Sequence, residues 1–91
     1  MSVRVKLPTQ LRAAAGGVAE VTADGVTVGE VLAGVYAQHP ELRDRLTDDG
    51  TALRRFVNVY VDGEDVRFGD GLDTPVAPGA ELQVLPAVAG G

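Results

Sequence analysis

The chain begins with alternating apolar and charged side chains over residues 3–7. A period of two places the apolar side chains on one face of a β-strand and the charged ones on the other. This pattern predicts a first strand that ends at Pro8. Gly16-Gly17 then predicts a turn, and residues 18–22 predict a second strand that closes a hairpin.

A helical period follows the hairpin. Thr27 and Glu30 are three residues apart, the spacing of a capping box, in which hydroxyl and carboxylate bind free N–H groups at a helix start. An apolar stripe at helical spacing follows, which predicts one amphipathic helix packed on the sheet and ended by His39-Pro40. We also expect a short helical turn over residues 41–46 and a mobile loop over residues 47–50. The stripe consists of Val28, Val31, Leu32, Val35 and Tyr36.

The second half of the chain returns to a period of two. Residues 56–61 alternate, which predicts a strand with its valines facing the helix and with Phe56 and Tyr60 on the opposite face. Asp62-Gly63 predicts a tight turn, and residues 66–68 predict the return strand. Loops and turns are expected between residues 69 and 79 because Gly and Pro recur there.

The last predicted strand covers residues 80–85. Its alternation places Leu82 and Val84 toward the helix and Leu85 outward, and Pro86 is expected to end regular pairing. A hairpin, one main helix and further strands predict an α+β protein in which the helix packs across one mixed sheet, the β-grasp arrangement of ubiquitin. We expect one domain over residues 1–85 and a flexible tail over residues 86–91.

Composition narrows the classes of partner. A length of 91 residues with 45% hydrophobic side chains suits one soluble domain, which we expect to be cytoplasmic and monomeric when free. The net charge of -5 disfavours nucleic acid, because phosphates are bound by Lys and Arg. No apolar run approaches the ~20 residues that span a membrane. The absence of cysteine excludes disulfides, thiolate metal sites and persulfides.

The ionisable residues match no metal or catalytic motif. His39 is the only histidine, and without a second His or a Cys it is better explained as a residue at a helix end. The acidic residues of the second half do not have the spacing of a calcium loop, so we interpret them as a solvated rim of turns. They are Asp62, Glu64, Asp65, Asp70 and Asp73.

The tail, residues 86–91, carries no charged side chain and ends in Gly90-Gly91. Fully extended, it reaches roughly 20 Å. The two glycines lack Cβ, so their backbone can pass through a narrow channel, at an ordering cost of about 0.5 to 1 kcal/mol each. The terminal carboxylate is then the group that the tail presents.

Three stretches carry a resemblance to a known family. Residues 56–61, residues 64–68 and residues 85–91 resemble the ThiS/MoaD/CysO sulfur carriers, nearest to those of thiocarboxylate-dependent cysteine biosynthesis, which also end in Ala-Val-Ala-Gly-Gly. The resemblance implies that an adenylyltransferase related to ubiquitin-activating enzymes joins Gly91 to AMP, using ATP and magnesium bound by that partner. A sulfur donor then produces a terminal thiocarboxylate. The carrier itself is implied to be no enzyme and to bind no cofactor or metal.

The same resemblance implies that Val88, Ala89 and Gly90 thread into the partner enzymes, which include a sulfur-accepting biosynthetic enzyme. Alternation places a second group of residues opposite the helix, where exposed aromatics mark either an interface or a local cluster covering the sheet. This predicted partner surface consists of Phe56, Tyr60, Leu85 and Arg67.

Two other functions stay open. A ubiquitin-like modifier would use the same acyl adenylate, with capture by a lysine amine of a target protein. A purely structural subunit would need no free terminus. The sequence also leaves open whether the sulfur serves cysteine, thiamine, molybdopterin or thiosugar biosynthesis.

Overall fold

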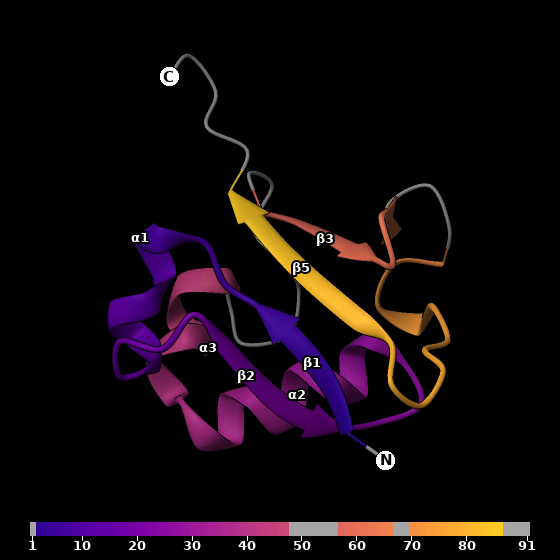
Figure 1. Cartoon of the computed structure of the whole chain (residues 1–91), viewed down its shortest axis with the longest axis horizontal. Helices are drawn as coiled ribbons and strands as arrows, with labels where there is room; N and C mark the ends of the chain where they lie inside the picture. The colour runs from indigo at the N-terminus through magenta and orange to yellow at the C-terminus, as the bar shows by residue number, and fades with distance from the viewer. Residues whose placement is uncertain (1, 48–56, 67–69, 87–91) are drawn as a thin grey trace.

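The computed structural model describes residues 2–47, 57–66 and 70–86. Its strands form one mixed sheet in the order β2-β1-β5-β3-β4 (Figure 1). The central strands β1 and β5 are parallel, and the other neighbouring pairs are antiparallel. The N-terminal strand therefore lies beside the last one. The strands are β1 (Ser2–Lys6), β2 (Glu20–Asp24), β3 (Val57–Val61), β4 (Glu64–Asp65) and β5 (Glu81–Pro86).

Helices cover one face of this sheet (Figure 1). The longest of them in the described part of the chain, α2 (Val28–Gln38), crosses the sheet, and α3 (Pro40–Leu46) follows it after one residue. A short helix, α1 (Thr9–Arg12), links β1 to β2 and continues into a 3-10 turn, Ala13–Ala15; a second 3-10 turn covers Gly71–Asp73. The predicted α+β fold, a β-grasp with one main helix on a mixed sheet, is confirmed.

The start of α2 has the predicted capping box. The Thr27 hydroxyl oxygen accepts a hydrogen bond of 3.2 Å from the Glu30 backbone N–H. The Glu30 carboxylate accepts one of 3.2 Å from the Val26 N–H, one residue earlier than in the usual box. His39 is the C-cap of α2 and Pro40 is the first residue of α3, so the predicted end of the main helix is also confirmed.

The core lies between the helices and the inner face of the sheet. Four of the five predicted stripe residues of α2 are buried, and Tyr36 is half-buried against them. Burying one such Val or Leu side chain contributes about 1.5–3 kcal/mol, so burial of the stripe supplies much of the driving force for folding. The strand residues that meet the stripe alternate as predicted and are fully buried: Val3, Val5, Val59, Leu82 and Val84.

The hairpin prediction was wrong in its connection and in the position of its second strand. Residues 9–15 form helical turns that bury Leu11, Ala14 and Ala15, where we expected no helix. The second strand is β2, two residues later than predicted, and it pairs Ser2 with Asp24 and Lys6 with Glu20. This register buries the apolar residues of β2 and leaves Val18 45% exposed. The predicted turn at Gly16-Gly17 is confirmed, with φ angles of 74° and 91°.

The tight turn at Asp62-Gly63 is confirmed, with φ angles of 48° and 93°. The return strand was predicted too late: β4 begins at Glu64 because a two-residue turn brings the chain directly back along β3, pairing Val61 with Glu64. Val66 follows β4 and is buried, and residues 67–68 lie outside the described residues. The Asp62 N–H donates to the Glu81 carbonyl at 2.9 Å, which ties this turn to the start of β5.

Two further boundaries differ from the prediction. β5 begins one residue late and includes Pro86, which pairs with Val57, so the expected tail begins inside the strand. Thr47, expected at the start of a mobile loop, is 2% exposed, and its hydroxyl donates to the Arg43 carbonyl at 2.6 Å. The hydroxyl satisfies a carbonyl at the end of α3, which had been predicted only as a short turn. Residues 48–50 lie outside the described residues.

Burial of the Tyr36 ring gives a titration that can be measured. Burial raises the pKa of Tyr36 from 10.0 to about 12. Because burial favours the neutral phenol, the contribution of Tyr36 to the stability of the fold is complete below about pH 10. It is lost as the pH rises toward the folded-state pKa of about 12. A tyrosinate absorbance titration should show a late ionisation that Tyr36→Phe removes. Ionisation of Tyr36 at the ordinary value in folded protein would contradict this expectation.

Candidate functional site

The candidate site begins at the end of β5, the strand that leads to the C-terminus. This strand lies between β1 and β3, and its last pair joins Pro86 to Val57. Leu82 and Val84 are fully buried, so the strand is anchored in the core almost to its end. The predicted tail residues Val88, Ala89, Gly90 and Gly91 lie outside the described residues. The structure thus defines the base from which they extend.

Two residues of the predicted partner surface lie close together on the outer face of the sheet. Tyr60 pairs with Gln83, and Asn58 pairs with Leu85. Tyr60 and Leu85 are therefore diagonal neighbours on adjacent strands, within reach of an aromatic ring. Both are partly exposed. Phe56 and Arg67 lie outside the described residues, and a role of this surface in binding stays a prediction.

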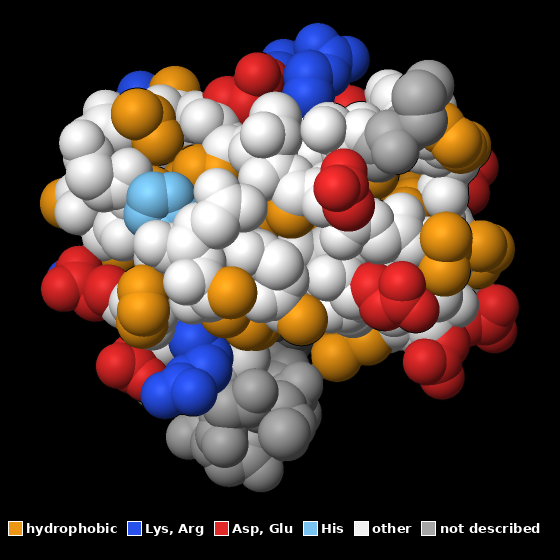
Figure 2. All heavy atoms as spheres, turned by 90° about the horizontal axis from the view of Figure 1, so that it is seen from below, with side chains coloured by type: hydrophobic (Ala, Val, Ile, Leu, Met, Phe, Trp, Pro, Cys, Tyr) orange, Lys and Arg blue, Asp and Glu red, His pale blue; other side chains and the backbone are white. Residues whose placement is uncertain are grey.

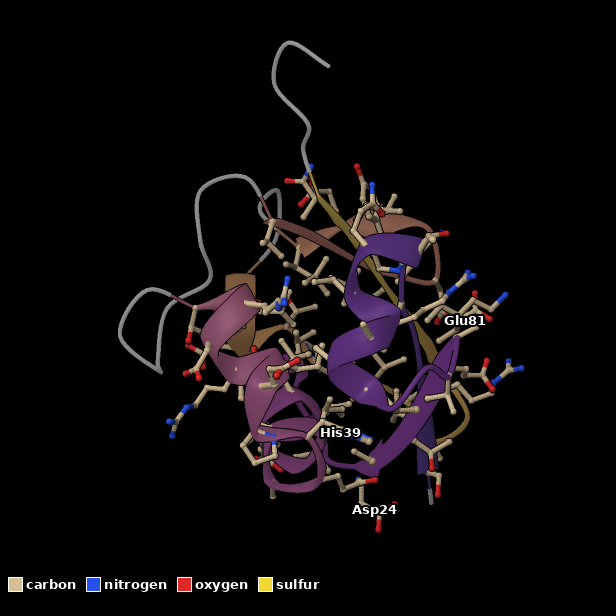
Figure 3. All side chains as sticks on the ribbon, turned by 90° about the vertical axis from the view of Figure 1, so that its left-hand side faces the viewer. Asp24, His39 and Glu81 are labelled. Atoms are coloured by element: carbon tan, nitrogen blue, oxygen red, sulfur yellow. The ribbon has the colours of Figure 1, made fainter. Side chains whose placement is uncertain are left out.

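The outer face also carries an ion-pair cluster that sequence reasoning missed. The Glu81 carboxylate forms ion pairs with both neighbouring cations, with Oε2 at 3.8 Å from Arg4 Nη2 and 3.4 Å from Lys6 Nζ. Figure 3 shows Glu81 on the side of the sheet away from the helices. The parallel register that pairs Arg4 with Glu81 creates the cluster, and this pairing is not visible in the local sequence. Such exposed pairs each stabilise the fold by only about 0–1 kcal/mol.

A groove of about 360 Å³ lies at the same end of the sheet as the end of β5. It is formed by the end of β1, by α1, by the start of β2 and by the last residues of β5. Figure 1 shows α1 and the end of β5 at this end of the molecule. Apolar spacing of Leu11, Ala14 and Ala15 was the signal that would have predicted α1 and hence this groove. Its walls include Lys6, Leu7, Pro8, Arg12, Glu20 and Leu85.

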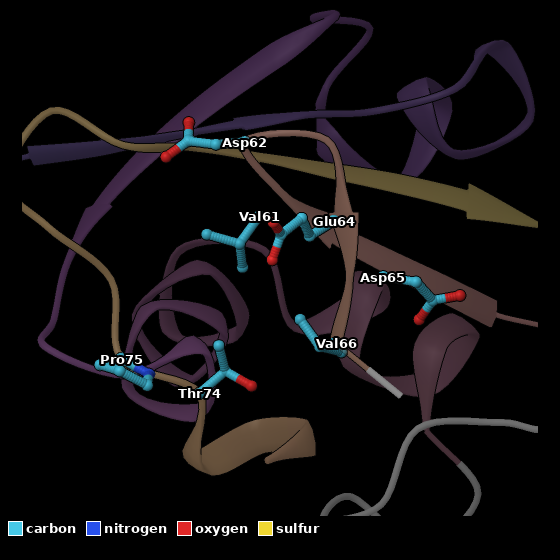
Figure 4. A pocket seen from close by; sticks show the side chains of 7 residues that line it. All are labelled: Val61, Asp62, Glu64, Asp65, Val66, Thr74 and Pro75. Atoms are coloured by element: carbon cyan, nitrogen blue, oxygen red, sulfur yellow. The ribbon is translucent and has the colours of Figure 1, made fainter. Parts of the chain in front are cut away.

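A larger cavity of about 590 Å³ lies at the opposite end of β5 (Figure 4). Three carboxylates of the predicted acidic rim belong to its lining, Asp62, Glu64 and Asp65. The Asp62 carboxylate accepts from the Glu81 N–H at 3.1 Å, so it serves the turn. The remaining lining residues are Val61, Val66, Thr74 and Pro75. No group of three residues able to hold a metal ion occurs in residues 2–47, 57–66 and 70–86.

Charge is dispersed over one face of the molecule. Figure 2 shows acidic side chains spread across one face, with Lys and Arg in separate places near its rim. This pattern differs from the continuous basic stripe that binds nucleic acid. His39 lies where α2 meets α3 (Figure 3), as expected for a residue at a helix end. In the described part of the chain, no helix is both long and apolar enough to cross a bilayer.

The helix-covered mixed sheet, with a central last strand that leads to a Gly-Gly terminus, defines a ubiquitin-like β-grasp protein. The ThiS family model matches residues 5–91, and the chain belongs to the ThiS family. The match extends to Gly91, so the sequence of the tail is part of what the family shares with this chain.

Individual relatives agree with this assignment. The chain is 46% identical over 93 residues to the sulfur carrier protein CysO of Mycobacterium tuberculosis, covering 100% of both chains. Its structure is similar to a chain in the Amycolatopsis orientalis BexX/CysO complex, with a TM-score of 0.90, 47% identity and 98% and 99% of the two chains covered. It is also 40% identical over 68 residues to small archaeal modifier protein 3 of Haloferax volcanii, covering 75% and 73% of the two chains. The resemblance to CysO-like carriers is confirmed.

Proposed function

We propose that this chain is a sulfur carrier protein whose Gly91 carboxylate is adenylated by a partner enzyme and then converted to a thiocarboxylate. The observation that carries the proposal is the full-length identity of 46% to a protein named as a sulfur carrier. The thiocarboxylate would donate sulfur to the biosynthesis of cysteine, thiamine, molybdopterin or a thiosugar. The carrier is a substrate of its partners, and it catalyses none of these steps.

The chemistry requires a partner because a carboxylate is a poor electrophile. Attack of the Gly91 carboxylate on the α-phosphate of ATP releases pyrophosphate and gives an acyl adenylate. A sulfur nucleophile then attacks the acyl carbon, the bond to AMP breaks, and AMP leaves. We propose that a ubiquitin-activating-enzyme-like adenylyltransferase supplies the ATP and magnesium sites. The thiocarboxylate sulfur then acts as the nucleophile in a sulfur-accepting enzyme.

Only one position in this chain can carry the transferred sulfur atom. The sequence contains no cysteine and one methionine. A methionine thioether is not a transferable sulfide, so sulfur that is carried must replace an oxygen of the Gly91 carboxylate. Val88, Ala89 and Gly90 are proposed to enter the partner's channel. Their small size permits this.

We also propose that the outer face of the sheet contacts these partners. Tyr60 and Leu85 are partly exposed diagonal neighbours there, close to the point from which the tail extends. Phe56 and Arg67 lie outside the described residues and are included in the proposed surface from the sequence alone. The Amycolatopsis orientalis relative, described as part of a BexX/CysO complex, supports the view that carriers of this kind dock on other proteins.

The test is intact-mass spectrometry of the carrier after incubation with its adenylyltransferase, ATP and a sulfide source. The mass is expected to rise by one oxygen-to-sulfur exchange, and fragmentation is expected to place the gain on Gly91. An alkylating reagent should trap the sulfur there. Omission of ATP is the control. An unchanged mass under complete conditions, with the enzyme active on another carrier, would contradict the proposal.

A second candidate function is a ubiquitin-like modifier joined to target lysines through Gly91. It is favoured by the 40% identity to a small archaeal modifier protein over 75% of the chain. The same acyl adenylate would be captured by a lysine amine in place of sulfide. Mass spectrometry of the protein from its own cells distinguishes the two, since conjugates linked through Gly91 without a sulfur-bearing form would favour the modifier.

A further inference from the structure

The groove beside the end of β5 combines an apolar wall with basic side chains. Pro8 and Leu85 contribute partly exposed apolar surface above the buried Leu7, and Lys6 and Arg12 contribute positive charge. Glu20 is the one carboxylate among the described lining residues. The lining residues thus carry two positive charges against one negative charge in a chain whose net charge is -5, and the Glu81 carboxylate paired with Lys6 lies outside the lining. A positively charged region on an otherwise negative molecule is suited to select a partner that presents negative charge there.

The side chains of Lys6 and Arg12 are placed to bind an additional anion. Lys6 Nζ lies 3.4 Å from the Glu81 carboxylate, and the two side chains are 50% and 31% exposed. Because such an exposed pair is weak, Lys6 can turn to a new carboxylate at little cost. The Arg12 Nε–H donates to the Leu7 carbonyl at 3.3 Å. This bond uses one of the five N–H donors of the guanidinium and orients the side chain at the groove.

The position of the groove connects it with the tail. Leu85 lines the groove, and β5 ends at Pro86 immediately after it. An enzyme that holds residues 87–91 must therefore approach this end of the sheet. A contact here would fix the point from which the tail enters the enzyme. Such a contact strengthens docking without touching the reacting carboxylate.

We propose that this groove receives an acidic side chain of the adenylyltransferase, with Lys6 and Arg12 as its ionic partners and Pro8 and Leu85 as the apolar surface beside it. The inference rests on the proposed function, since it assumes that the partner adenylates the tail. Lys6 and Arg12 are positioning residues. They raise the fraction of encounters in which Gly91 reaches the active site, and they take no part in the chemistry.

The experiment measures ATP-dependent thiocarboxylation as a function of carrier concentration for wild type, Lys6→Glu and Arg12→Glu. Each reversal is expected to lower kcat/KM by about tenfold or more through a higher KM, with kcat nearly unchanged, because a like charge now faces the partner's carboxylate. The wild-type kcat/KM should also fall with added salt, and less so in the variants. Arg45→Glu on α3 is the matched control, because Arg45 is exposed and does not line the groove.

Conservative variants keep the test independent of folding. Lys6→Arg is expected to retain nearly full kcat/KM, and Lys6→Met to lose part of it, while both melt like wild type. Variants of Lys6 and Arg12 that match Arg45→Glu in KM and in salt dependence would overturn the groove proposal. If wild type itself gains no sulfur, the proposed function fails, and the groove proposal fails with it.

Discussion

Removal of Gly91, or addition of residues after it, is expected to abolish adenylation while the melting temperature stays unchanged. The terminal carboxylate is the reacting group, so either change removes it or moves it away from ATP. The fold does not depend on this group, because the core of the described residues is complete by Val84. ATP–pyrophosphate exchange with the adenylyltransferase measures the first effect, and thermal melting measures the second.

The control for this loss is an extension of equal length at the N-terminus. β1 begins at Ser2 and runs parallel to β5. The N-terminus therefore lies at the opposite end of the sheet from the end of β5, where the tail begins (Figure 1). An added segment there leaves the Gly91 carboxylate free, so exchange should continue. Normal exchange by the chain without Gly91 would show that the carboxylate of Gly91 is not the activated group.

The sequence predicted the elements whose periodicity is set by burial on one face. The stripe of α2 and the alternation of Leu82 and Val84 follow directly from contact with one core. The turn at Asp62-Gly63 was also predictable, because Asp and Gly adopt the positive φ angles that a two-residue hairpin turn requires. Local patterns of this kind do not depend on knowledge of which strands become neighbours.

Features that depend on long-range pairing were missed. Glu81 meets Arg4 and Lys6 because β5 lies parallel to β1, and their sequence separation gives no sign of it. The groove also required α1, which we did not predict although Leu11, Ala14 and Ala15 have helical spacing. Arg12 therefore did not enter the predicted partner surface.

The position of strand ends was the least predictable property. β2 and β4 differ from the prediction by about two residues because register is decided by the partner strand and by the geometry of the connection. The consequence for the candidate site is small at β5, where the shift is one residue and Leu85 still faces outward beside Tyr60. The predicted outward position of these two residues is therefore confirmed, and their role in partner binding stays a prediction.

Leu82→Ala is expected to lower the free energy of unfolding by about 2 to 5 kcal/mol, since it removes methyl and methylene groups from a tightly packed site. Leu82 is 0% exposed in the centre of the sheet. A domain of this size has only about 5–15 kcal/mol in total, so the loss should be evident as a lower urea midpoint. Binding of the adenylyltransferase by the folded fraction should change little, because Leu82 faces the helices.

Leu85 supplies the matched control on the same strand, with its side chain on the opposite face. Leu85→Ala should cost much less stability than Leu82→Ala, since its side chain is partly exposed and leaves a smaller cavity. Leu85→Glu should have a larger effect on partner binding than on unfolding, because it places a carboxylate on the proposed contact surface. Calorimetry gives the affinity and urea denaturation the stability. Equal losses of stability at the two positions would contradict the assigned burial, and unchanged affinity for Leu85→Glu would return Leu85 to a structural role.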